Sequence, residues 1–249
     1  MSNSRSLYLI VAACLGFTSV ALSCGSHNRA PSQEERKEKT AGSKAPPETG
    51  APASERAVPQ DDRPVIVTFG DSLTAGVAGR SYPDDLQDLL DQHGYMYRVD
   101  NQGVSGDTTT DGLARIDNVV AQHPALVVLE FGGNDGLRGI PVEATRANLQ
   151  QMIERLKDAR IPTALLGITL PPNYGPEFVK PFTAIFPDLA KQYRLPFLPF
   201  LLVNVYKSGA LMQPDGIHPN GAGNKIVAQD VFKLICPMLG TAARYRQSK

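Results

Sequence analysis

Short, mostly apolar runs alternate with amphipathic stretches through most of this chain, and that alternation is the strongest constraint on its fold. Three of the runs, 65–69, 125–131 and 163–168, are too short for typical helices and predict buried strands. Strands that are apolar on both faces belong in a mostly parallel sheet with helices on both sides. In such a sheet, ligands bind at the carboxyl ends of the strands.

The segments between these runs supply the helices and two further strands. Apolar residues recur at helical spacing at Leu149, Met152, Ile153 and Leu156. The same criterion predicts helices around 86–90, 113–120, 177–194 and 227–235. The remaining two strands are predicted at 96–99 and 197–200.

The N-terminus predicts an export signal. Residues 1–24 combine an early Arg5 with an apolar run that is shorter than a membrane span, which needs roughly 20 apolar residues. The run ends in Ala21-Leu22-Ser23-Cys24, which resembles a bacterial lipoprotein processing site. We therefore expect export from a bacterial cytoplasm with a lipid on Cys24, and an ordinary cleaved signal is the alternative. The protein would then be membrane-anchored in the first case and free in the periplasm in the second.

Composition separates the remaining parts of the chain. Residues 25–62 are dominated by Pro, Ala, Ser, Gly, Glu and Lys and predict a disordered linker, which leaves 63–240 as the folded domain and 241–249 as a tail. The chain has 25 Lys and Arg against 25 Asp and Glu, so its charge does not favour a nucleic-acid partner. Cys236 is the only cysteine of the predicted domain, which excludes a disulfide within it.

Polar residues with the chemistry of acyl transfer follow the first strand and precede the last helix. Gly70-Asp71-Ser72-Leu73 comes directly after the first strand, where a tight turn places Ser72 in a cleft. An alkyl alcohol is a poor nucleophile without a base, and Asp215 and His218 supply a carboxylate and an imidazole three residues apart. Each residue alone also fits a turn or a helix cap. Together, in the order Ser, Asp, His, they predict a hydrolytic triad.

Two glycine-rich clusters supply the hydrogen-bond donors that a triad still lacks. After the second strand, Gly103 allows a backbone N–H to approach a ligand closely, and after the third strand Asn134 aims a side-chain amide at the same point. With the N–H of Ser72 they predict an oxyanion hole of three donors. Turns rich in Gly and Asn are common after strands, but such clusters at successive strand ends favour a site.

Four short blocks, namely Gly70–Leu73, the cluster with Gly103, the cluster with Asn134, and Asp215 with His218, resemble those of the SGNH (GDSL) hydrolases. They occur in the same order along residues 64–240. The neighbouring sequence is similar to the thioesterases, lysophospholipases and arylesterases of that family. The resemblance implies a three-layer α/β/α sandwich with a five-stranded parallel, flavodoxin-like sheet and neither metal nor cofactor. It also implies that Ser72 is the nucleophile, His218 the general base and Asp215 its orienting partner. Gly103 and Asn134 would complete the oxyanion hole.

The resemblance implies a serine esterase that hydrolyses carboxylic esters or thioesters through an acyl-enzyme. The apolar, proline-rich segment after the fourth strand predicts the wall of an acyl pocket, with Pro172, Tyr174 and Phe178 on its rim. For an exported monomer, a lysophospholipid or another membrane-derived ester is the expected substrate. A carbohydrate O-acetyl esterase and a non-catalytic lipoprotein binding module are the alternatives, and the complete set of blocks disfavours the binding module.

Overall fold

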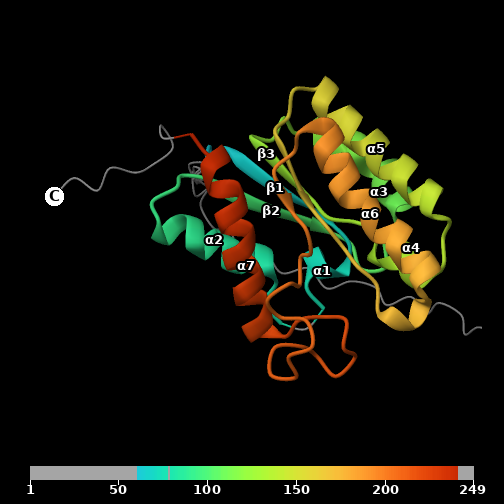
Figure 1. Ribbon diagram of the computed structural model, residues 1–249. Helices are drawn as coiled ribbons and strands as arrows, with labels where there is room; N and C mark the ends of the chain where they lie inside the picture. The colour runs from blue at the N-terminus through green and yellow to red at the C-terminus, as the bar shows by residue number, and fades with distance from the viewer. Residues whose placement is uncertain (1–60, 78, 241–249) are drawn as a thin grey trace, which may run out of the picture. The chain divides into compact units, whose positions relative to one another are not determined.

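A parallel sheet forms the centre of the computed structural model, which describes residues 61–77 and 79–240 (Figure 1). These residues all belong to one compact unit of the chain, Ala57–Lys249, while the other unit, Met1–Arg56, lies outside them. The predicted signal with Cys24, nearly all of the predicted linker and the predicted tail therefore fall outside the described residues. No helix within the described ranges is long and apolar enough to cross a membrane.

The sheet of the described residues has five strands, and every neighbouring pair is parallel. In sheet order they are β2 (Arg98–Gly103), β1 (Val65–Gly70), β3 (Leu126–Leu129), β4 (Thr163–Leu166) and β5 (Phe197–Leu198). This is the flavodoxin-like order, in which the switch point lies between the first and third strands. Burial on both faces explains why β1, β3 and β4 consist of apolar runs.

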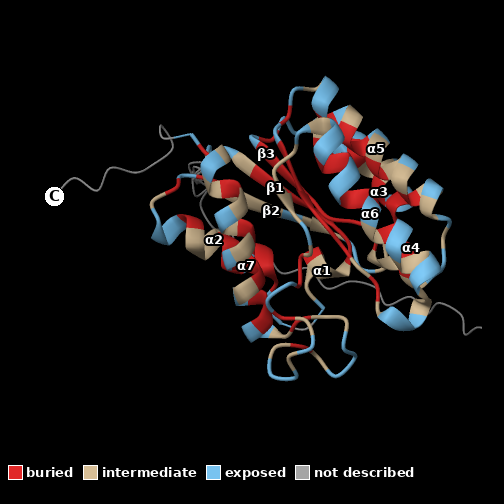
Figure 2. Ribbon diagram, in the orientation of Figure 1, coloured by how far each residue is buried: buried red, intermediate tan, exposed pale blue. Residues whose placement is uncertain are grey.

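Helices cover both faces of the sheet, so the predicted three-layer fold is confirmed (Figure 1). The helices α2 (Tyr82–Gln92) and α7 (Gly221–Ile235) pack together on one face. On the other face lie α3 (Thr109–Val120), α5 (Val142–Asp158) and α6 (Pro176–Tyr193). Figure 2 shows the buried residues concentrated in the strands and on the helix surfaces turned toward them. The short elements are α1 (Ser72–Ala75), α4 (Gly133–Leu137), η1 (Pro172–Tyr174) and η2 (Cys236–Met238).

The second strand lies later in the sequence than predicted. The prediction placed it at 96–99, whereas β2 runs from Arg98 to Gly103 and Met96 is 43% exposed. Since β2 is an edge strand, most of its residues are only partly buried, and it accommodates the polar sequence 100–102. An apolar run is therefore a poor marker for this strand.

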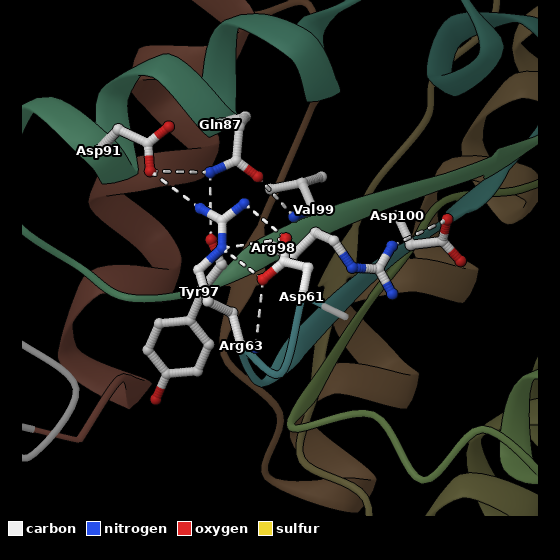
Figure 3. Close-up of polar contacts among 8 residues, drawn as sticks. All are labelled: Asp61, Arg63, Gln87, Asp91, Tyr97, Arg98, Val99 and Asp100. Atoms are coloured by element: carbon white, nitrogen blue, oxygen red, sulfur yellow. Dashed lines mark hydrogen bonds and ion pairs between the residues drawn. The ribbon is translucent and has the colours of Figure 1, made fainter. Parts of the chain in front are cut away.

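Ion pairs fix the first described residues at the amino end of β1 (Figure 3). The Arg63 guanidinium lies 2.8 Å from Asp61 Oδ2 and 3.3 Å from Oδ1 of Asp91 on α2. Gln87 Nε2 donates to the same Asp91 oxygen, and Gln87 Oε1 accepts the N–H of Val99 on β2. The first described residues therefore lie at the amino ends of the strands, opposite the carboxyl ends where ligands bind.

Candidate active site

The turn after β1 presents Ser72 at the carboxyl edge of the sheet. Ser72 is the first residue of α1, and Asp71 caps this short helix by accepting the N–H of Leu73 on Oδ1 at 2.9 Å. Gly70 is required by close packing, since a Cβ there would lie 2.2 Å from Thr74 Oγ1 and 2.5 Å from Glu130 Oε2. The Gly-Asp-Ser sequence therefore combines close packing, a helix cap and a hydroxyl at the strand end.

The structure brings together the three residues predicted as a triad. Ser72 Oγ lies 2.8 Å from His218 Nε2, and His218 Nδ1 lies 2.8 Å from Asp215 Oδ2. Asp215 Oδ1 also accepts the backbone N–H groups of Ile217 and His218, each at 3.0 Å. Partial burial tends to raise the pKa of Asp215, but hydrogen bonds from the imidazole and the two N–H groups outweigh it and lower that pKa. Asp215 is therefore a carboxylate at neutral pH and orients the imidazole.

Hydrogen bonds before and after His218 hold its loop in place. Met212 and Pro219 form an antiparallel bridge, and the N–H of Gln213 donates to the carbonyl of His218 at 2.8 Å. Asn220 then caps α7 by accepting the N–H groups of Ala222 and Gly223. These contacts fix the imidazole without help from a regular strand.

Asn134 lies beside Ser72, as predicted, at the start of α4. Its Nδ2 donates to the carbonyl of Asp107 at 2.9 Å and to Asp71 Oδ2 at 3.3 Å. Within the part of the chain that the structure describes, the N–H of Ser72 has no hydrogen-bond acceptor. An amide side chain and an unused backbone N–H therefore meet at the hydroxyl.

Gly103 does not supply the free N–H that the sequence predicted. Its N–H donates to Asn101 Oδ1 at 3.0 Å, and Gly103 does not line the cavity at Ser72. Gly106 has a φ of +89°, and its N–H meets no acceptor in the described ranges. It directly precedes Asp107, whose carbonyl holds Asn134. The unused donor thus lies three residues beyond the predicted one.

A largely apolar cavity of about 630 Å³, open mouth included, extends from the hydroxyl. Ser72, Asn134 and His218 stand in its lining. The apolar part of the lining comes from α4, from the segments after β4 and β5 and from the His218 loop; it includes Leu137, Ile168, Leu170, Phe200, Leu202, Tyr206 and Ile217. An apolar lining with a few polar groups converging on it is typical of a small-molecule site.

A model of the GDSL-like Lipase/Acylhydrolase family matches residues 68–226. "Esterase TesA" of Pseudomonas aeruginosa is 38% identical over 178 residues, which cover 70% of this chain and 89% of the relative. The chain belongs to this family. "Thioesterase 1/protease 1/lysophospholipase L1" of Escherichia coli K12 is 39% identical over 178 residues, covering 70% of this chain and 84% of the relative.

Solved structures agree with this membership. "Crystal Structure of TesA" has a TM-score of 0.67 at 38% identity and covers 70% of this chain and 99% of that one. "Crystal structure of AlinE4, a SGNH-hydrolase family esterase" has a TM-score of 0.59 at 38% identity and covers 72% and 98%. The predicted family is thereby confirmed, and the GDSL-like chain is a carboxylic ester hydrolase of the serine esterase or thioesterase class.

The wall of the cavity in this GDSL-like hydrolase differs from the predicted one. Pro172, Tyr174 and Phe178 are not lining residues, because η1 and the first turn of α6 direct them elsewhere. Tyr174 donates its hydroxyl to the carbonyl of Leu137 at 3.4 Å, and the Phe178 ring packs 6.1 Å from that of Phe182. Tyr174 therefore contacts the back of the wall at Leu137. The loop after β5, which supplies lining residues instead, has no periodic pattern that marks it in the sequence.

Arg115 on α3 is a site residue that the sequence analysis missed. Its Nε pairs with Asp107 at 2.9 Å, and its other nitrogens donate to the carbonyls of Gln102 and Gly70 at 2.9 and 3.0 Å. The guanidinium also lies 4.3 Å from the centre of the Phe69 ring. Arg115 therefore joins the ends of β1 and β2 to the loop that holds Asn134.

Among the described residues, no group of three or more His, Cys, Asp or Glu is arranged to hold a metal ion.

Proposed function

We propose that this hydrolase cleaves esters and thioesters of fatty acyl chains with Ser72 as its nucleophile. The hydrogen-bonded series from Ser72 to His218 to Asp215, with two contacts of 2.8 Å, carries the proposal. His218 Nε2 takes the hydroxyl proton as Oγ attacks the carbonyl carbon, and then gives it to the leaving group. The same imidazole activates the water that releases the acid from the acyl-enzyme. Asp215 keeps Nδ1 protonated and stabilises the imidazolium that forms in each half-reaction.

Three donors stabilise the oxyanion in this proposal: the N–H of Ser72, the N–H of Gly106 and the Asn134 amide. Gly106 replaces Gly103 because the N–H of Gly103 is already used by Asn101. The 2.9 Å bond to the Asp107 carbonyl keeps the Asn134 side chain oriented. Its bond to Asp71 is longer, 3.3 Å, so that hydrogen is shared with the oxyanion while Asp71 continues to orient the amide.

The apolar cavity favours an acyl chain longer than acetyl. An acetyl group would leave much of the wall formed by Leu170, Phe200 and Leu202 uncovered, whereas each buried methylene contributes about 0.8 kcal/mol to binding. A lysophospholipid or another membrane-derived ester meets this requirement. The name of the E. coli relative includes lysophospholipase L1.

Hydrolysis of p-nitrophenyl esters from acetyl to palmitoyl by the full chain tests the proposal. We expect a preference for chains longer than acetyl, and a loss of about 10³-fold or more in kcat/KM for Ser72→Ala. Ser208→Ala is the matched control, because this serine lies outside the proposed machinery and should stay within about twofold of the wild type. Retained activity in Ser72→Ala would refute the nucleophile. A clear preference for acetyl esters would favour a carbohydrate O-acetyl esterase.

We propose, in addition, that the enzyme is exported and carries a lipid on Cys24. Residues 1–24 have the composition of a signal, and the cysteine directly follows Ala21-Leu22-Ser23. Labelled palmitate supplied to expressing bacteria should enter the wild type and not Cys24→Ser, and the variant should leave the membrane fraction. Equal labelling of both proteins would refute lipidation at this residue. Size-exclusion chromatography of the Cys24→Ser protein tests the expected monomer.

A further inference from the structure

A completely buried acid stands directly behind the Ser72 turn. Glu130 follows β3 and is 0% exposed. Its Oε2 accepts the N–H of Asp71 at 3.2 Å and the hydroxyl of Thr74 at 2.9 Å. Its Oε1 has no donor among the described residues. An ionised carboxylate with one unpaired oxygen is costly at such a position.

A second buried carboxyl group faces it. Asp71 is 1% exposed, and its side chain contacts that of Glu130. Asp71 Oδ1 accepts the N–H of Leu73, while Oδ2 accepts the amide of Asn134. Two adjacent buried carboxyl groups do not both ionise at neutral pH, because desolvation and mutual repulsion oppose the second charge. One of the two must therefore retain a proton.

The surroundings decide which acid retains it. Burial raises the pKa of both groups, and the charge of Asp71 raises that of Glu130 further. Hydrogen bonds from the Leu73 N–H and the Asn134 amide favour the ionised form of Asp71. Tyr82 of α2, whose hydroxyl lies 3.5 Å from Thr74 Oγ1, is the other titratable group near the pair, and burial raises its pKa so that it stays neutral. The charge therefore lies on Asp71 and the proton on Glu130.

We propose that Glu130 is a positioning residue of the oxyanion hole: as a neutral carboxylic acid it donates its O–H to the Asp71 carboxylate, which in turn holds Asn134 beside Ser72. This inference rests on the proposed function, because Asn134 matters for the rate only if an oxyanion forms there. Glu130 has two tasks, since it accepts hydrogen bonds on Oε2 and donates one to Asp71. Glutamine can perform both tasks, and leucine can perform neither.

Kinetics of the full chain on p-nitrophenyl octanoate test the positioning role. We expect Glu130→Gln to stay within about threefold of the wild-type kcat, and Glu130→Leu to lose about 10- to 100-fold in kcat with KM changed less than threefold. Thr163→Val is the control for lost stability, because it removes a buried hydroxyl at the amino end of β4, away from Ser72. It should lower the melting temperature and leave kcat unchanged.

The pH dependence of unfolding tests the proton itself. Above its ordinary pKa an unfolded glutamate is ionised, whereas Glu130 keeps its proton in the fold until the pH reaches its raised pKa, so unfolding releases a proton. Relative to Glu130→Gln, the unfolding equilibrium constant of the wild type should therefore rise with pH between those two pKa values, by up to about tenfold per pH unit. A purely packing role for Glu130 would give no such difference.

Three results would overturn the inference. Glu130→Gln would lose as much kcat as Glu130→Leu if an ionised carboxylate were required. Glu130→Leu would keep the wild-type kcat if Glu130 did not position Asn134. Parallel pH dependence of unfolding in the wild type and Glu130→Gln would show that the proton is absent, and this measurement decides even if Glu130→Leu does not fold. Activity retained by Ser72→Ala would instead refute the proposed function and leave the unfolding result interpretable.

Discussion

Carboxyl groups lie on two sides of Ser72, and they differ in their exposure to water. The Asp215 side chain is 40% exposed and acts through His218, whereas Asp71 and Glu130 are almost completely buried. Hydrogen bonds lower the pKa of Asp215, while burial raises the pKa of the other two acids. A carboxyl group is therefore ionised at Asp215, whereas the buried pair of Asp71 and Glu130 retains one proton.

This difference matches what each side of the site has to do. The imidazole becomes a cation in the proposed reaction, and the exposed carboxylate of Asp215 stabilises it. The oxyanion side must limit negative charge, and a proton on Glu130 keeps the buried pair at a single charge. The experiments below break or sharpen this contrast.

Asp215→Asn should produce the largest effect, a loss of about 10³- to 10⁴-fold in kcat/KM. A neutral amide neither stabilises the imidazolium nor fixes the protonated Nδ1. Hydrolysis of p-nitrophenyl octanoate measures the loss, with Asp188→Asn as the matched control on an exposed helix surface. A loss smaller than tenfold would show that the exposed carboxylate is not essential to the base.

Asn134→Ala should cost about 10²- to 10³-fold in kcat, with a smaller change in KM, because its amide acts mainly on the oxyanion. The change leaves the His218 contacts untouched, so it separates the two sides of the site. Asn118→Ala, on the exposed side of α3, is the control. A change confined to KM would place Asn134 in substrate binding and remove it from the oxyanion hole.

The smallest effect is on the pH dependence of stability. Asp215 stabilises the fold more as the pH rises, whereas Glu130 stabilises it less. Since the fold lowers the pKa of Asp215, its carboxylate stabilises the protein above the unfolded value of 3.8, and this stabilisation is lost as the pH falls through the folded value. Asp215→Asn should therefore melt slightly below the wild type at pH 6.5 and by a smaller margin at pH 3. The shift is small because water screens the exposed group.

Thermal melts at the two pH values measure this shift. The Glu130→Gln variant provides the comparison, since it should gain stability relative to the wild type as the pH rises. An Asp215→Asn difference that is the same at pH 3 and pH 6.5 would contradict the lowered pKa of Asp215.

Burial explains which elements the sequence revealed. The strands β1, β3 and β4 are covered on both faces, so their apolar runs were sufficient to predict them. At the sheet edge, β2 has a polar sequence, and its true position depends on pairing with β1 rather than on its own composition. Local sequence does not encode that register.

The site divides in the same way. The contacts among Ser72, Asp215 and His218 were predictable because these residues carry distinctive chemistry at strand and helix ends. The choice between Gly103 and Gly106 was not, because it depends on where the Asn101 side chain places its oxygen. Glu130 had one signal that went unused: it is a lone acid in the apolar run 125–131, and a charge in a buried strand needs a partner.

The position of Asp61–Pro64 has a practical consequence. The described chain starts at the amino edge of the sheet, where Arg63 ties it to α2, while Ser72 and its cavity lie at the carboxyl edge. A label or fusion partner joined directly before Asp61 would therefore be attached at the amino ends of the strands, away from the Ser72 cavity, and should leave turnover unchanged.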